Sequence, residues 1–466
     1  MLTAVHLDTA SHTPIYRQLS DHIRESIRSG NLNPGDRIPP TRELAGQLGL
    51  NRATIAAAYE LLESEGWIKG HVGRGSFVQP WQNELTPISF ASSRPSEELF
   101  PLDHFRTVCR QVLDGQDLGA ILQLGSPFGY EPLRRWLIED AFTSGISRGS
   151  DKVVITNGCQ QALDLIARAL IQPGDAVLVE DPVYPGLREA FSRSGARVIG
   201  VQVGEDGYRL DLLEHALRRD RPKLVLVTPS FQNPTGASLP LDARHRLIAI
   251  VRDAGALLVE NAIYAGLRYE GAPLPSLKAM DETGETVQLG SFSKIAFPGL
   301  RVGWVLAPTR IAAALAETKQ WCDLHSDQLS QAVLVRFAES GLLEQHRKRM
   351  IETGALRLAA CLEACARHLP KTARFTRPQG GMNLWVTLPA PLDAAELLHR
   401  AEAVGVSYLP GRFFSATAEP GCLRLSFAGL NPGKIHRGVS LLGTLFKEEL
   451  ARARLAHHSQ PALAMV

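Results

Sequence analysis

The 466-residue sequence predicts an α/β protein: a small N-terminal helical unit, a large domain with a mostly parallel sheet, and a smaller α+β lobe at the C-terminal end. Three observations lead to this fold class. Short amphipathic helices and a hairpin are indicated before residue 80, apolar strand runs alternate with helical patterns from about residue 101, and a long helical stretch past about residue 330 leads to two more strands.

The composition is that of an ordinary globular protein, with 44% hydrophobic residues, 21% charged residues and a net charge of +2. A charge this small does not by itself indicate nucleic-acid or membrane binding. The six cysteines are scattered, which favours reduced thiols and a cytoplasmic location. Cys361, Cys365 and His368 lack a second ligand cluster, so no metal site is predicted. The sequence begins without a signal peptide and has no apolar run near the ~18 residues that span a bilayer, so no membrane association is expected.

The first unit is predicted to span residues 12–79. Apolar residues recur every four positions from Ile15 to Ile27, which indicates an amphipathic helix that ends at Gly30. A second short helix, "TRELAGQL", and a third with Asn51 as its N-cap follow, and "WIKGHVGRGSFV" indicates a hairpin around a glycine-rich turn. Two helices joined by a tight turn and followed by a hairpin describe a winged helix–turn–helix, which is a DNA-binding fold.

The stretch "GDRIPPTRELAGQLGLNRATIAAAYELLESEGWIKGHVGRGSFV" closely resembles the GntR family of bacterial regulators. The resemblance implies that this unit binds operator DNA through Arg42, Arg52 and the wing residues Gly73 and Arg74. Asn51 and Thr54 can add hydrogen bonds to phosphates. A further basic position of the family is Ala56 here, which leaves the operator sequence open.

Net charge does not support DNA binding, because the basic and acidic residues of 1–80 cancel. The prediction depends on where the basic residues lie, at helix starts and in the wing. The alternative is a degenerate or protein-docking winged helix.

Residues 80–100 contain several prolines and little periodicity, so they are predicted to be a linker. Beyond them, residues 101–455 are predicted to form one larger domain. Its large part, about 101–330, alternates strands and helices as in a parallel sheet covered by helices. Its small lobe is expected at about 331–455.

Polar side chains follow the ends of several predicted strands of the large part, where open α/β sheets bind ligands. Lys294 lies in "SFSK", seven positions before Arg301. Pyridoxal 5′-phosphate requires a lysine for an imine, donors for the phosphate, partners for the ring nitrogen and phenolic oxygen, and a face to stack on. The residues expected to provide these contacts are Gly158, Cys159, Gln160, Tyr184, Asn233, Asn261, Tyr264, Ser291, Ser293, Lys294 and Arg301.

Each contact has its own expected role. The helix N-terminus after Gly158 offers amides at Cys159 and Gln160 to a phosphate, which Ser291, Ser293 and Arg301 complete. Lys294 is the candidate catalytic residue, Tyr184 stacks on the ring, and Asn233 and Tyr264 reach the phenolic oxygen. Any one of these signals is weak, since "NPTG" is a common turn and Tyr184 could lie in the core. Their occurrence together and in this order indicates the cofactor.

From about residue 101 to 450 the chain resembles the fold-type I aminotransferases of the aspartate aminotransferase superfamily. The resemblance implies that Arg424, in "LRLSF", binds the α-carboxylate of a substrate. A GntR-like winged helix joined to such a domain resembles the MocR subfamily of transcription regulators. That resemblance implies a domain-swapped homodimer whose effectors are the cofactor and small amino-group compounds that form imines with it.

Two positions depart from the aminotransferase pattern. The aspartate that faces the ring nitrogen is replaced by Asn261, and Glu260 cannot substitute for it because neighbouring strand residues point to opposite faces. A tyrosine that reaches the partner subunit's cofactor phosphate is replaced by Leu124, with Tyr130 nearby in sequence. Both changes weaken catalysis more than binding.

Three functions therefore remain open. The leading one is a transcription regulator that senses an amino-group effector through an imine at Lys294. The alternative is a working aminotransferase, on 2-aminoadipate or aromatic amino acids, that carries a winged helix. The third is a sensor of vitamin B6, in which the bound cofactor is itself the signal.

Overall fold

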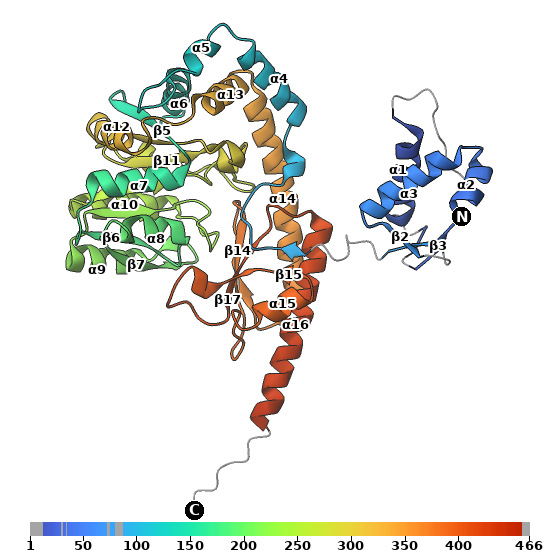
Figure 1. Ribbon diagram of the computed structural model, residues 1–466. Helices are drawn as coiled ribbons and strands as arrows, with labels where there is room; N and C mark the ends of the chain where they lie inside the picture. The colour runs from blue at the N-terminus through green and yellow to red at the C-terminus, as the bar shows by residue number, and fades with distance from the viewer. Residues whose placement is uncertain (1–12, 29–30, 34, 72–74, 80–86, 459–466) are drawn as a thin grey trace, which may run out of the picture. The chain divides into compact units, whose positions relative to one another are not determined.

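A computed structural model describes residues 13–28, 31–33, 35–71, 75–79 and 87–458 (Figure 1). The chain separates into two compact units, Met1–Pro87 and Ile88–Val466. None of the helices in these described ranges is both long enough and apolar enough to cross a membrane.

The first unit is a winged helix–turn–helix, as predicted. Gly49, in the left-handed region with φ 65°, makes the tight turn between the second and third helices, and Asn51 caps the third by accepting a hydrogen bond from the Ala53 amide at 3.0 Å. A three-stranded antiparallel sheet of order β1-β3-β2 combines a strand between the first two helices with the hairpin that follows the third. The elements are α1 (Ile15–Arg28), β1 (Arg37–Ile38), α2 (Thr41–Leu48), α3 (Arg52–Ser64), β2 (Ile68–His71) and β3 (Gly75–Val78).

The second unit contains an eight-stranded sheet of order β5-β12-β11-β10-β9-β6-β7-β8. The ladders from β11 to β7 are parallel, and the remaining ladders, which involve β5, β12 and β8, are antiparallel. This agrees with the predicted mostly parallel sheet. The strands are β5 (Asp151–Thr156), β6 (Ala176–Asp181), β7 (Arg197–Gly204), β8 (Gly207–Tyr208), β9 (Leu224–Val227), β10 (Leu257–Asn261), β11 (Val287–Ser291) and β12 (Gly303–Pro308).

Helices cover both faces of this sheet (Figure 1). One face packs against α7, α8 and α12, and the other against α9 and α10 and against a group formed by α4, α6 and α13. The helices are α4 (Leu102–Leu113), α5 (Leu118–Ile121), α6 (Glu131–Thr143), α7 (Cys159–Leu170), α8 (Pro185–Ser192), α9 (Leu210–Asp220), α10 (Leu241–Asp253), α11 (Leu277–Met280), α12 (Thr309–Asp323) and α13 (Gln328–Glu339).

A smaller α+β lobe follows, with an antiparallel sheet of order β13-β14-β17-β16. Its buried core includes Cys361 and Cys365, which pack among apolar side chains. The elements are α14 (Leu342–His368), β13 (Arg374–Phe375), β14 (Asn383–Thr387), α15 (Leu398–Ala403), β15 (Val406–Ser407), β16 (Leu409–Pro410), β17 (Cys422–Ser426) and α16 (Pro432–His458).

The predicted linker, residues 80–100, is wrong over its second half. Strand β4 (Ile88–Ser89) pairs with β15, and a short 3-10 helix, η1 (Glu97–Leu99), follows. Phe90 is fully buried in the core of the small lobe. The prolines hid this short strand, but burial of its apolar side chains fixes the segment to the lobe.

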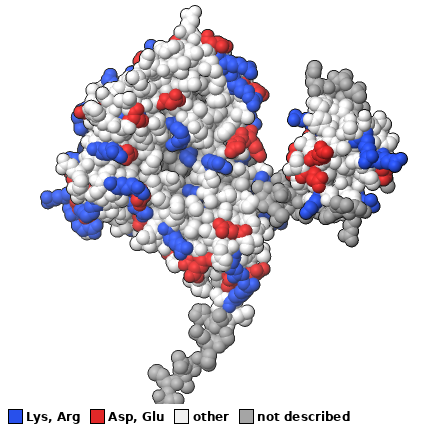
Figure 2. Space-filling view, in the orientation of Figure 1, with Lys and Arg blue, Asp and Glu red and all other residues white. Residues whose placement is uncertain are grey.

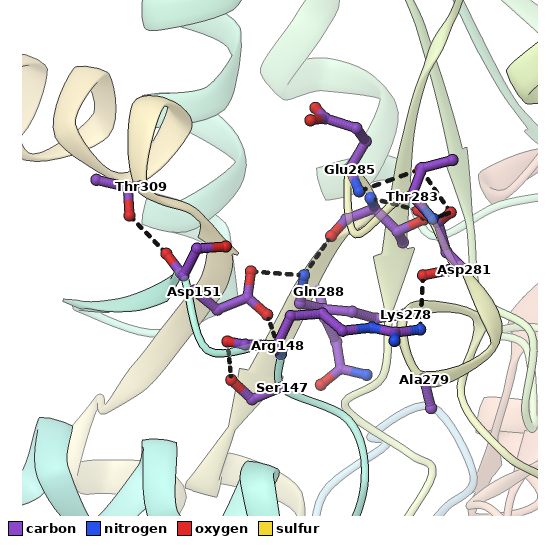
Figure 3. A network of polar contacts seen from close by, with 12 residues as sticks. Ser147, Arg148, Asp151, Lys278, Ala279, Asp281, Thr283, Glu285, Gln288 and Thr309 are labelled. Carbon is purple, nitrogen blue, oxygen red and sulfur yellow. Dashed lines mark hydrogen bonds and ion pairs between the residues drawn. The ribbon is translucent and has the colours of Figure 1, made fainter.

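A buried ion pair joins the amino ends of the sheet strands (Figure 3). Lys278 of α11 donates from Nζ to Asp151 Oδ1 at 3.0 Å and to the Thr286 carbonyl at 2.8 Å, with both charged side chains almost fully buried. Asp151 Oδ2 also accepts from the Arg148 amide at 2.7 Å. These contacts join the start of β5 to the residue before β11. They lie at the amino ends of the parallel strands, opposite the strand ends that carry the candidate site.

Candidate functional site

A cavity of about 380 Å³ lies at the carboxyl ends of the central strands. A larger groove of about 670 Å³ lies at the amino ends of these strands and is lined by other residues. The smaller cavity brings together, from many separate segments, all but one of the predicted cofactor residues and the predicted carboxylate arginine. These lining residues are Cys159, Gln160, Tyr184, Asn233, Asn261, Tyr264, Ser291, Ser293, Lys294, Arg301 and Arg424.

The remaining predicted residue, Gly158, lies beside the cavity and contacts Arg301. It precedes α7 with φ 82°, a backbone conformation that favours glycine, and a Cβ placed there would displace the end of the Arg301 side chain. Arg301 donates to Ser293 Oγ and to the Asn157 carbonyl, both at 3.4 Å. The guanidinium, the serine hydroxyl and the start of α7 therefore form a donor set that fits a phosphate group.

Asn261 ends β10 and lines the cavity floor. Its Nδ2 donates to Thr228 Oγ1 at 3.1 Å, and its Oδ1 lies 3.9 Å from the Cys159 thiol. Burial raises the pKa of that thiol to about 12, so it is a neutral donor. The two side chains that contact the candidate partner of the ring nitrogen here, Thr228 and Cys159, are thus both uncharged.

Glu260 points away from the cavity, as the alternation along the strand predicted. Its carboxylate accepts from the Leu277 and Lys278 amides, each at 3.0 Å, and from Gln288 Nε2 at 3.0 Å. Burial raises its pKa. The neighbouring acid therefore belongs to a structural network on the other face of the sheet.

Asn233 and Tyr264 lie together, as a shared role at a phenolic oxygen requires. Asn233 Nδ2 donates to the Tyr264 hydroxyl at 3.4 Å. Tyr184, which precedes α8, is 44% exposed and donates its backbone amide to the Asn233 carbonyl at 3.1 Å. An aromatic ring left this open at a cavity wall can stack on a planar ligand.

Lys294 and Arg424 both donate to backbone carbonyls of the segment that follows β4. Lys294 Nζ donates to the Ser93 carbonyl at 2.6 Å, and Arg424 Nη2 donates to the Ala91 carbonyl. Sequence reasoning missed this segment because it was assigned to the linker. Its contribution is through backbone atoms, which leave no pattern in side-chain type.

The guanidinium of Arg424 is buried in the cavity wall and held by neighbouring residues. The residue is 2% exposed, its Nη1 donates to Asn233 Oδ1 at 3.0 Å, and its guanidinium lies 5.0 Å from the centre of the Phe414 ring. Burial lowers its pKa to about 10, which leaves it charged at neutral pH. Its Nε has no hydrogen-bond partner among the described residues. A carboxylate is the ligand that this geometry suits.

In the first unit, the predicted DNA contacts Arg42 and Arg52 lie at the starts of α2 and α3, with exposed side chains. Asn51 and Thr54 lie in the same first turn of α3. Figure 2 shows one group of basic side chains at the right of this unit and further single basic side chains elsewhere on it. Gly73 and Arg74 lie outside the described residues.

Two acidic residues at the C-terminal end of α3, Glu63 in its last turn and Glu65 at its C-cap, are engaged within the unit. Glu63 accepts from the Gly70 amide at 2.8 Å, and Glu65 pairs with Arg24 at 3.1 Å. These contacts place the acidic groups away from the helix starts. A balanced net charge is therefore compatible with a basic face.

Two family models match the chain. "Bacterial regulatory proteins, gntR family" matches residues 15–78, and "Aminotransferase class I and II" matches residues 98–442. The second match covers most of the sequence and includes every predicted cofactor residue.

Curated relatives fall into two groups. The chain is 27% identical to the "Probable rhizopine catabolism regulatory protein MocR" of Rhizobium meliloti, over 94% of this chain and 95% of the relative. It is 38% identical to a "2-aminoadipate transaminase" of Thermus thermophilus, over 78% of this chain and 91% of the relative. Only the first group extends over both units.

Solved structures resemble the larger unit. A kynurenine aminotransferase of Pyrococcus horikoshii superposes with a TM-score of 0.76 at 34% identity, covering 78% of this chain and 92% of that chain. An α-aminoadipate aminotransferase of Thermus thermophilus superposes with a TM-score of 0.73 at 38% identity, covering 79% and 95%. The aminotransferase class I and II family depends on pyridoxal phosphate, and the donor set described above fits that cofactor. The chain therefore belongs to the MocR-type GntR regulators, in which a winged helix–turn–helix is joined to a pyridoxal phosphate-dependent aminotransferase domain.

Proposed function

We propose that this protein is a DNA-binding transcription regulator that senses a small amino-group effector through an imine formed at Lys294 with pyridoxal phosphate. It acts in the cytoplasm, where its operator DNA lies. The cofactor supplies an aldehyde and an electron-withdrawing ring. The observation that favours sensing over turnover is Asn261, a neutral amide at the position that faces the ring nitrogen.

Protonation of the ring nitrogen is the step at which a neutral amide and a carboxylate differ. A neighbouring carboxylate typically raises the pKa of such a group by about 1–3 units. Each unit corresponds to ~1.4 kcal/mol of differential stabilisation. Asn261 can donate a hydrogen bond to the nitrogen but adds no negative charge. Removal of the substrate's Cα proton, which needs a strongly electron-withdrawing ring, is slowed, whereas binding of the amino group is not.

The same cavity offers a route from ligand to DNA-binding unit along the chain. An effector carboxylate at Arg424 competes with the Ala91 carbonyl, and covalent use of Lys294 Nζ competes with its bond to the Ser93 carbonyl. Both carbonyls belong to the segment that continues, through residues 80–87, into the first unit. Ligand binding thus changes the restraints on that segment.

Exposed apolar side chains support a homodimer. Leu124 is 74% exposed, Trp321 is 83% exposed and Leu324 is 55% exposed. Gln328 at the start of α13 donates to the carbonyls of Ile121 and Gln123, at 3.2 and 2.7 Å, which joins the two chain segments that carry these side chains. A second copy of the chain would cover this surface, with the winged helix of each subunit exchanged onto the other.

The second candidate is a working aminotransferase. Relatives at 35% and 38% identity are named "Aromatic-amino-acid aminotransferase 1" and "2-aminoadipate transaminase". Lys294 and Arg424 are both retained in the cavity. If the protein is an aminotransferase, catalysis proceeds with Asn261 at this position. The winged helix is then autoregulatory or vestigial.

One experiment separates these functions. Operator DNA is selected from random sequences with the full-length protein loaded with pyridoxal phosphate, and amino acids are then screened for changes in both cofactor absorbance and operator affinity. The proposal expects at least one amino acid that changes both, with little keto acid formed. Steady-state transamination without any effect on DNA would support the enzyme, and an effect of the cofactor alone would support the vitamin B6 sensor.

A further inference from the structure

A network of hydrogen bonds between polar side chains fixes the turn before α7, Asn157–Cys159. Asp323, the last residue of α12, accepts on Oδ2 from Asn157 Nδ2 at 3.0 Å and from Gln161 Nε2 at 2.6 Å. Gln161 Oε1 accepts in turn from the Asn157 backbone amide at 2.7 Å. The backbone and the side chain of Asn157 are therefore both fixed by one pair of side chains.

Lys319 completes the network. Its side chain is fully buried, and Nζ donates to both carboxylate oxygens of Asp323 at 2.7 Å and to Gln161 Oε1 at 3.1 Å. Burial lowers the pKa of Lys319, although Asp323 opposes this shift. Because its ammonium group is turned toward Asp323 and Gln161, Lys319 acts on the turn and not on a ligand.

The opposite side of the same turn faces the candidate phosphate site. The Asn157 carbonyl accepts from Arg301 Nη2 at 3.4 Å, and the amides of Cys159 and Gln160 begin α7. A shift of Asn157 would therefore move the guanidinium and the helix start together. Buried pairs that fix a loop in this way raise affinity by orienting the groups that touch the ligand.

We propose that Asp323, Lys319 and Gln161 are positioning residues for the phosphate of the cofactor, which rests on the proposed binding of pyridoxal phosphate at this site. The alternative is that the network is only structural, as the Lys278–Asp151 pair at the other edge of the sheet is (Figure 3). That pair has the same chemistry and a fully buried lysine, although its aspartate is 1% exposed against 24% for Asp323, and neither of its residues lines the cavity, so it serves as a control.

The test compares two ligands that differ only in the phosphate. Binding of pyridoxal 5′-phosphate and of pyridoxal is measured by absorbance for the full-length protein and for the Asp323→Asn and Asp151→Asn variants. Loss of a charge-assisted hydrogen bond at the turn is expected to weaken pyridoxal phosphate about 10-fold in Asp323→Asn. Pyridoxal affinity should stay within about twofold, and the ratio of the two affinities should be unchanged in Asp151→Asn.

Asn157→Ala provides a second variant at an exposed position, in case Asp323→Asn does not fold. It removes one bond to Asp323 and should reduce pyridoxal phosphate affinity selectively, by a smaller factor. An equal loss for both ligands, or no loss for either, would overturn the positioning role while leaving the cofactor assignment intact. Wild-type protein that binds no pyridoxal phosphate would overturn the proposed function and this inference with it.

Discussion

At the scale of single residues, the proposed function depends most on Asn261. Its amide contacts the Thr228 hydroxyl and the neutral Cys159 thiol, and neither of these groups supplies the charge of the missing carboxylate. We predict that Asn261→Asp speeds the first half-reaction by orders of magnitude, because the added charge stabilises the protonated ring. The measurement is the single-turnover change in cofactor absorbance after an amino acid is mixed with the loaded protein.

Effector affinity separates this effect from a general improvement of the site. Imine exchange needs little electron withdrawal, so the dissociation constant should change by less than about threefold in Asn261→Asp. An equal gain in affinity and rate, or no gain in rate, would show that Asn261 does not control the ring nitrogen.

Lys294 gives a second prediction at this scale. Lys294→Ala should lose the absorbance band of the covalently bound cofactor and its fixation by borohydride, which in the wild type should label the "SFSK" peptide. The fold should remain, because the phosphate site does not include the lysine. Borohydride-stable attachment of the cofactor in Lys294→Ala would show that another amine carries it.

At the scale of secondary-structure elements, the two helices of the first unit should contact DNA at their starts. We predict that Arg42→Ala and Arg52→Ala weaken operator binding and leave the cofactor spectrum unchanged. Loss of a phosphate contact should lower the salt slope by about one, and loss of a base contact should cost ~1–3 kcal/mol. Fluorescence anisotropy at several salt concentrations measures both, with Arg17→Ala on α1 as a control of equal charge. Wild-type affinity in both helix-start variants would place the DNA interface elsewhere.

Glu180, near the end of β6, makes the free energy of unfolding depend on pH. Burial raises the pKa of Glu180 to about 8 from an ordinary value of 4.5, although bonds from Thr228 and Gln232 oppose the shift. The folded state therefore holds a proton that the unfolded state releases, and stability falls as pH rises from about 4.5 to about 8, by at most ~1.4 kcal/mol per pH unit. We predict that Glu180→Gln flattens this part of the curve in urea unfolding. A slope identical to that of the wild type would contradict the shift.

The winged helix and the alternating strands were predictable because their apolar residues repeat with the period of the element and end at glycine or a cap. Strand β4 was not, since two residues are too short to show a period. The cavity residues follow strand ends and were recognisable by type, whereas the Ala91 and Ser93 carbonyls and the network of Lys319 depend on tertiary contacts alone.

At the scale of the whole molecule, the chain runs from the cavity segment of residues 90–93 through β4 and residues 80–87 into the DNA-binding unit. Three added residues, Gly-Ser-Gly, between Glu84 and Leu85 should preserve effector affinity and operator affinity measured separately. They should reduce the effect of one on the other, because the added length absorbs changes in the restraint on residues 88–93. The same insertion between Glu282 and Thr283, in a surface turn near α11, is the control. Full coupling in the linker variant would show that the signal passes between subunits by another route.

The central claim is that one cavity binds an amino compound at Lys294 and thereby changes DNA binding, without rapid turnover. The most direct measurement is an effector titration of the wild-type protein, loaded with pyridoxal phosphate and bound to fluorescent operator DNA, with cofactor absorbance and DNA anisotropy recorded in the same sample. We predict that both signals change at the same effector concentration. We also predict that bound operator changes effector affinity by a certain factor, and that bound effector changes operator affinity by the same factor. An absorbance change that leaves anisotropy constant, with keto acid formed at the ~1–10³ s⁻¹ of ordinary enzymes, would contradict the claim.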